Sequence, residues 1–306
     1  MNKHLKGILM VLIGSMLWGA TGPMMEWILH EGAINASFML TIRLLLAGIA
    51  LLSFIKWRGQ NVTAIWKNKY WATSLVLFSL IGMLGVQYTF VATINSSNAV
   101  FATLLQFLAP IFIILYVSFA NKMLPPIYQV LGIIGTLVGL FLLLTNGQLN
   151  ELLVSNSALI WGVALGFAFA FYTVYPVKIM NEWGVMQVVA WSMIVGGSVL
   201  GIISGFWQWE QWAVLMQPQI LLMMLGVIFF GTIAFVLFLG SMTYITPVET
   251  SVLSSMEPLT ATAVSIVWLG RTLELYQFVG VVVMLLFVTW LSIEGDRQSR
   301  KNALEK

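Results

Sequence analysis

Ten apolar segments of about twenty residues each run through the chain, separated by short polar connections. A helix needs about 20 apolar residues to cross a hydrocarbon core ~30 Å thick, so each segment is long enough to span a membrane. Together they leave no room for a soluble domain. The sequence therefore predicts an all-α polytopic membrane protein with ten transmembrane helices, at roughly 7–29, 37–55, 71–94, 98–119, 126–145, 158–177, 185–206, 219–240, 247–268 and 275–293.

Composition supports the same class. Apolar residues make up 60% of the 306 residues, charged residues only 8%, and the mean hydropathy is +0.95. A soluble domain is about 25% charged, so this chain has too little charge to cover a surface in water. It contains no Cys, which excludes disulfides, Cys zinc sites and Cys nucleophiles. The 14 basic residues are scattered over the connections rather than clustered, and we expect no nucleic-acid partner.

The distribution of Lys and Arg predicts the orientation in the membrane. Twelve of these residues fall on the side of the N-terminus, only Arg271 falls on the opposite side, and Arg43 lies within a span. The positive-inside rule then places both termini in the cytoplasm, with the protein in the cytoplasmic (inner) membrane. The first segment follows Lys3 and Lys6 like a signal sequence, but it lacks an A-x-A cleavage site, so we expect it to be retained.

An internal repeat appears when the sequence is shifted by 148 residues. Residues 90–93 (FVAT) then fall on 238–241 (FLGS), Pro110 falls on Pro258, and 128–132 (YQVLG) fall on 276–280 (YQFVG). This predicts two five-helix repeats, residues 1–150 and 151–306. Because five is odd, the repeats enter the membrane from opposite sides, which is the inverted construction found in many secondary transporters. The alternative is a duplication with no role in transport.

Motifs for ATP hydrolysis, zinc proteolysis and serine hydrolysis are absent from the sequence. There is no G-x-x-x-x-G-K-[ST], no H-E-x-x-H and no G-x-S-x-G, and the two His residues are far apart. We therefore expect neither an enzyme nor a metal or cofactor site. Pairs with G-x-x-x-G spacing, such as Gly135 and Gly139, indicate close helix packing.

The ninth segment carries the most informative charge. Glu257 lies near its middle, and Thr250 and Ser254 share its helical face at 100° per residue. Pro258 removes a backbone donor and frees the Ser254 carbonyl. Ionisable groups inside a membrane are functional by default, so we expect Glu257 to bind a substrate amine or a coupling proton. The alternative is a neutral carboxyl group that only hydrogen-bonds within the bundle.

Further polar or aromatic side chains lie deep in other segments, and each either lines a cavity or packs between helices. They are Gln106, which the repeat aligns with Ser254, and Trp18, Gln87, Tyr88 and Tyr172.

Glu26 and Arg43 have similar depths in the first two segments, and a salt bridge would reduce the cost of burying each. The alternatives are an outer gate, or an Arg43 that receives a substrate carboxylate.

Several of these elements resemble the drug/metabolite transporter superfamily, and specifically its EamA-like members. They are Leu17-Trp18-Gly19, residues 43–47 (RLLLA), the prolines of the fourth and ninth segments, and the Tyr-Gln-x-x-Gly openings of the fifth and tenth. The resemblance implies a central cavity lined by spans one, three, four, six, eight and nine, with spans five and ten at the periphery. It also implies substrates such as amino acids, amines, vitamins or drugs, often moved outward and often with proton coupling.

The leading expectation is therefore a secondary transporter of a small organic metabolite, with amino acids or amine-bearing compounds favoured. Its partners would be that substrate, the lipid bilayer and protons, and it would act as a monomer or homodimer. The alternative within transport is a broad-specificity exporter of hydrophobic cations. Outside transport, a membrane enzyme could use Glu249 and Glu257 as acids on lipid-linked substrates, and a structural or signalling partner is a third class.

Overall fold

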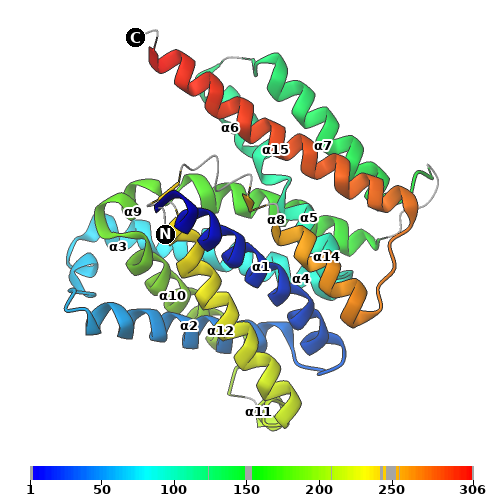
Figure 1. Ribbon diagram of the computed structural model, residues 1–306. Coiled ribbons are helices and arrows are strands. Elements are labelled where there is room, and N and C mark those ends of the chain that lie inside the picture. The colour runs from blue at the N-terminus through cyan, green and yellow to red at the C-terminus, as the bar shows by residue number, and fades with distance from the viewer. Residues whose placement is uncertain are drawn as a thin grey trace.

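The computed structural model describes residues 3–122, 124–148, 154–207, 209–241, 244–245, 253–254 and 256–304, and the regular elements in these ranges are all helical (Figure 1). The elements that build the spans are α1 (Lys3–His30), α2 (Ala36–Trp57), α3 (Lys69–Leu77), the π-helical segment η2 (Phe78–Leu84), α4 (Gly85–Ser96), α5 (Ala99–Gln106), α6 (Ala109–Asn121), α7 (Ile127–Thr145), α8 (Asn156–Val174), α10 (Val185–Ser204), α12 (Pro218–Ser241), α14 (Met256–Leu269) and α15 (Leu275–Leu304). Short connecting helices are η1 (Ala64–Lys67), α9 (Val177–Trp183) and α11 (Trp209–Leu215).

The predicted spans are confirmed. Within the described ranges, nine helical stretches are long and apolar enough to cross a membrane, and α14 is a shorter apolar helix at the place of the ninth. Part of the ninth predicted span, residues 247–252 and 255, lies outside the described residues. The tenth continues as a helix beyond its predicted end at residue 293, because α15 runs to Leu304.

Polar side chains at the helix starts explain where several spans begin. The side-chain oxygens of Asn35, Asn68, Asn98 and Ser155 accept hydrogen bonds from backbone N–H groups in the first turns of α2, α3, α5 and α8. Such caps satisfy donors that the first helical turn leaves free. Asn98, at the end of a predicted span, is thus a capping residue.

Packing between the two halves follows a twofold pattern. If span n of the first half corresponds to span n+5 of the second, then the pair α1–α12 corresponds to the pair α4–α8, and both pairs are in contact. The pair α1–α14 likewise corresponds to the contacts of α8 with α5 and α6, and the pairs α2–α10, α5–α14 and α7–α15 each map onto themselves. This is the arrangement that two inverted five-helix repeats produce.

The pair α7–α15 lies at the edge of the bundle (Figure 1), where its buried side chains share a hydrophobic cluster with α5. The two helices approach closely at Gly139 and Gly280. A Cβ atom on Gly139 would lie 2.6 Å from the Met284 backbone nitrogen and 2.8 Å from the Gly280 carbonyl oxygen. Only a residue without a side chain fits there, as the G-x-x-x-G spacing of Gly135 and Gly139 indicates.

Candidate functional site

A small cavity of ≈ 40 Å³ lies between the two halves of the chain. The first half contributes Trp18 of α1, Arg43 of α2 and Gln87 of α4 to its wall, and the second half contributes Tyr172 of α8 and both Thr232 and Phe235 of α12. A buried water needs about 10–15 Å³ of such space, so the cavity has room for only a few waters in this arrangement.

Arg43 is the charged group of this cavity, and its side chain is only 8% exposed. Its Nη1 atom donates to Gln87 Oε1 at 2.8 Å and lies 3.6 Å from Met25 Sδ. Its Nη2 and Nε atoms face Gly231 of α12, where a Cβ atom would lie 3.4 and 4.0 Å from them. One side of the guanidinium is thus held by neutral groups, and the other side faces a position that carries no side chain.

Aromatic rings form much of the remaining wall. The Trp18 ring meets Phe235 and Phe238 with centroid distances of 6.0 and 5.1 Å. The Tyr172 ring stacks on Phe78 of η2 at 5.4 Å. These contacts come from both halves, so a movement of one half against the other changes the shape of the cavity.

A π-helical segment separates the two ends of the third span. Segment η2 supplies Met83 to the cavity wall, and α4 begins directly after it with Gln87 as its third residue. Such π turns are rare in helices and often occur at functional sites. Here Gln87 follows the π turn by three residues and accepts the hydrogen bond from Arg43.

Three of the residues predicted to bind substrate therefore lie at the cavity, namely Trp18, Gln87 and Tyr172, and so does Arg43, which was predicted as an ion-pair or gate residue. Tyr88 does not line it. Its ring packs edge-on against Trp161 of α8 at 5.8 Å. Gln106 is the last residue of α5, before the break that precedes Pro110, and it is also not part of the lining. For Trp18, Gln87, Tyr172, Tyr88 and Gln106, a role in substrate binding stays a prediction.

Glu257 occupies the first turn of α14 and is not among the cavity-lining residues. Its backbone carbonyl packs directly against Gly19 of α1, beside Trp18. The expectation of a free Ser254 carbonyl is wrong, because the Glu257 backbone N–H donates to it at 2.9 Å. Pro258 lies within the first helical turn, where an N–H group would have no helical partner anyway. Thr250 lies outside the described residues.

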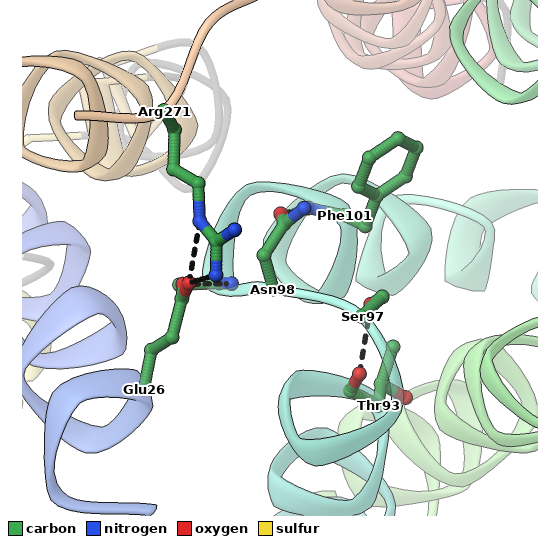
Figure 2. A network of polar contacts seen from close by, with 7 residues as sticks. Glu26, Thr93, Ser97, Asn98, Phe101 and Arg271 are labelled. Atoms are coloured by element: carbon green, nitrogen blue, oxygen red, sulfur yellow. Dashed lines mark hydrogen bonds and ion pairs between the residues drawn. The ribbon is translucent and has the colours of Figure 1, made fainter. Parts of the chain in front are cut away.

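The expected Glu26–Arg43 ion pair is also wrong, because Glu26 pairs with Arg271 (Figure 2). The Glu26 side chain is 2% exposed, and Arg271 Nε donates to its Oε1 at 2.9 Å. Its Oε2 accepts from the Ala99 backbone N–H at 2.7 Å, at the N-terminus of α5. Helical geometry explains the difference. Met25 faces Arg43, and the next residue is rotated by about 100° around α1.

Three important residues were not predicted. Arg271 was the lone basic residue on its side of the membrane, and that exception was a signal that it has a specific partner. Gly231 and Thr232 interrupt an otherwise apolar span, but nothing in the sequence shows that they face Arg43.

Comparison with known proteins gives a consistent result. Residues 5–145 and 156–293 each match the sequence model of the EamA-like transporter family. A protein of Salmonella typhimurium described as an uncharacterized inner membrane transporter, YicL, is 36% identical over 301 residues, which cover 98% of this chain and 99% of that protein. One solved crystal structure shares the fold, with a TM-score of 0.56 and 13% identity over 95% of this chain and 97% of the other.

Proposed function

This chain belongs to the EamA-like transporter family, and on that basis we propose that it is a secondary transporter that moves a small organic metabolite across the cytoplasmic membrane by alternating access. The observation that carries the proposal is the cavity whose wall is shared between the two repeats. Secondary transporters built from inverted repeats bind their substrates at such a place, near the midplane of the membrane.

The closed arrangement of the cavity fits one step of an alternating-access cycle. A space of ≈ 40 Å³ is too small for a metabolite, so the halves must separate before a substrate can enter. The ion pair between Glu26 of the first half and Arg271 of the second half supports a gate at one end of the bundle. Breaking this pair would let α1 and α5 move away from the connection that follows α14.

Among amine-bearing compounds, we favour amino acids as substrates, because their carboxylate offsets the charge of Arg43, with export coupled to protons through Glu257. The contact between the Glu257 main chain and Gly19 supports this role, because a change of charge at residue 257 would act on α1 beside Trp18. The excess of Lys and Arg on one side supports the placement of both termini in the cytoplasm.

A broad-specificity exporter of hydrophobic cations is less well supported. Such a protein needs a loose aromatic cavity, whereas this cavity contains the buried positive charge of Arg43. A like charge in a medium of low dielectric constant repels a cationic substrate.

Transport by the purified protein in liposomes would test the proposal. We expect saturable uptake of at least one labelled metabolite from a panel of amino acids, amines and organic acids. The variant Tyr172→Ala should reduce it strongly, whereas Tyr116→Ala, which alters a 62% exposed side chain on α6, should not. Equal uptake by protein-free liposomes, or an equal effect of both variants, would contradict the proposal.

A further inference from the structure

The buried guanidinium of Arg43 has no acidic partner within the described part of the chain. Neither of the ion pairs found there, Glu26–Arg271 and Glu294–Arg297, includes it. Its contacts are instead with the neutral groups of Gln87 and Met25. A charged group inside a membrane is costly and normally pairs with an opposite charge or serves a function. An unpaired cation that faces a cavity points to an anionic ligand.

The direction of the guanidinium defines where that ligand would bind. Nη1 is occupied by Gln87, but the Nε and Nη2 atoms form the edge that faces Gly231. Arg presents parallel N–H donors in a planar fork, and that fork matches the two oxygens of a carboxylate. The absence of a side chain at residue 231 leaves space in front of this edge.

The surroundings of Arg43 define the rest of the ligand. The Thr232 hydroxyl donates to the Ile228 carbonyl oxygen at 2.6 Å and is not free to donate to a ligand, so the guanidinium is the polar part of the wall, while Trp18, Tyr172 and Phe235 provide apolar surface. A carboxylate attached to an apolar body would satisfy both parts of this wall. A ligand that carries only a cation would leave the Arg43 guanidinium without an anionic partner.

We infer that the cavity recognises small organic carboxylates, and that Arg43 binds the carboxylate through its Nε–Nη2 edge across Gly231. This inference rests on the proposed transport function and names its substrate class. Amino acids and simple monocarboxylic acids share the chemistry, and the experiment below distinguishes them.

Ligand-dependent thermal stabilisation of the detergent-purified protein gives a test that does not require transport. The probes are phenylalanine and phenylacetate, each compared with its amide, phenylalaninamide or phenylacetamide. We expect at least one carboxylate to raise the unfolding temperature and its amide not to do so. If phenylalanine alone acts, the substrate is an amino acid, and if both acids act, the amine is not required.

Two variants locate the binding site. Arg43→Gln should weaken binding of the active carboxylate by at least about tenfold, since a charge-assisted bidentate contact is lost. Gly231→Ala is the sharper variant, because only Arg43 lies within 4 Å of the added Cβ atom, at ordinary contact distance. It should fold like the wild type and still weaken binding by narrowing the space in front of the fork. Gly295→Ala, whose Cβ atom would meet nothing within 4 Å, is the matched control and should bind normally.

Three results would overturn the inference. They are equal stabilisation by amides and carboxylates, no response to any carboxylate, or unchanged binding in both Arg43→Gln and Gly231→Ala. Liposome uptake separates this failure from that of the transport proposal. If an amine or a neutral metabolite is taken up and Arg43→Gln does not affect this uptake, the transport proposal holds and the carboxylate site is refuted. No uptake of any metabolite by well-folded protein would instead contradict the transport function.

Discussion

Glu26 and Arg271, which are 245 positions apart in the sequence, form an ion pair that joins the two repeats at one end of the helical bundle. The same carboxylate also accepts the Ala99 N–H at 2.7 Å. One anion is therefore held by a side chain of the second repeat and by the first turn of a helix in the first repeat. This dual contact has consequences that can be measured.

Replacing Arg271 with Ala should lower the free energy of unfolding by about 1–2 kcal/mol, since it leaves a buried carboxylate with only its backbone partner. This loss of stability is smaller than for a fully buried ion pair, because the Arg271 side chain is 45% exposed and solvent weakens such pairs. Thermal unfolding in detergent would measure the change. Exchanging the charges, with Glu26→Arg and Arg271→Glu together, should not rescue stability, because a cation at residue 26 would face the Ala99 N–H. A rescue would show that the contact with α5 is unimportant.

The same ion pair should control access to the cavity. Because the chain has no Cys, a single Thr232→Cys variant reports on the cavity wall alone. We expect a water-soluble maleimide to label it slowly, and to label it several times faster when Arg271→Ala is added. A Gln60→Cys variant in the exposed connection after α2 should be labelled at a rate that does not depend on Arg271. Identical labelling rates at Thr232→Cys in both backgrounds would argue against a gate.

Opposite effects are expected for two glycine-to-alanine changes. Gly139→Ala places a methyl group against the Gly280 and Met284 backbone and should destabilise the protein by about 1–3 kcal/mol. Gly295→Ala adds a methyl group in open space on α15 and should be neutral or stabilising by up to about 1 kcal/mol. Thermal unfolding of the two variants side by side would check the signs. Similar behaviour would mean that α7 and α15 are not closely packed.

Glu257→Gln should uncouple transport from protons. It removes the titratable group beside the α1–α14 contact while keeping nearly the same shape. In liposomes, uptake by the wild type should respond to an imposed pH gradient, and uptake by the variant should not. Glu31→Gln, an exposed carboxylate after the end of α1, is the control and should respond normally. If uptake by Glu257→Gln still responded to the pH gradient, the coupling proton would bind to another group.

The predicted topology can be checked with reporters on the C-terminus. With both termini in the cytoplasm, a C-terminal green fluorescent protein should fluoresce and a C-terminal alkaline phosphatase should be inactive. A fusion after Arg271 should show the reverse, because that connection lies on the other side. Active phosphatase at the C-terminus would overturn the assigned orientation.

Much of the fold could be predicted because hydropathy is a local property. A run of twenty apolar residues identifies a span wherever it packs, and the predicted segments match the observed helices closely. The repeat was visible because its residues keep a constant spacing. Neither hydropathy nor the repeat spacing shows how a helix is rotated about its own axis relative to its neighbours.

That missing rotation explains the errors at the site. Periodicity placed Glu257 on a polar face, but it could not show that this turn of α14 packs on Gly19 rather than lining the cavity. It could not show either that Met25, and not Glu26, faces Arg43. Trp18, Gln87 and Tyr172 were identified because polar or aromatic groups deep in a span need partners, and the cavity is where these three meet.

The π turn in the third span acts as a one-residue phase shift. An α-helix turns by about 100° per residue, so a single extra residue changes the face on which every later side chain lies. The side chains of residues 69–77 and of residues 85–96 therefore follow different helical phases, although both stretches belong to one span. Deleting one residue from Phe78–Leu84 would restore a continuous α-helical register, so that residues 69–77 and 85–96 would follow a single helical phase.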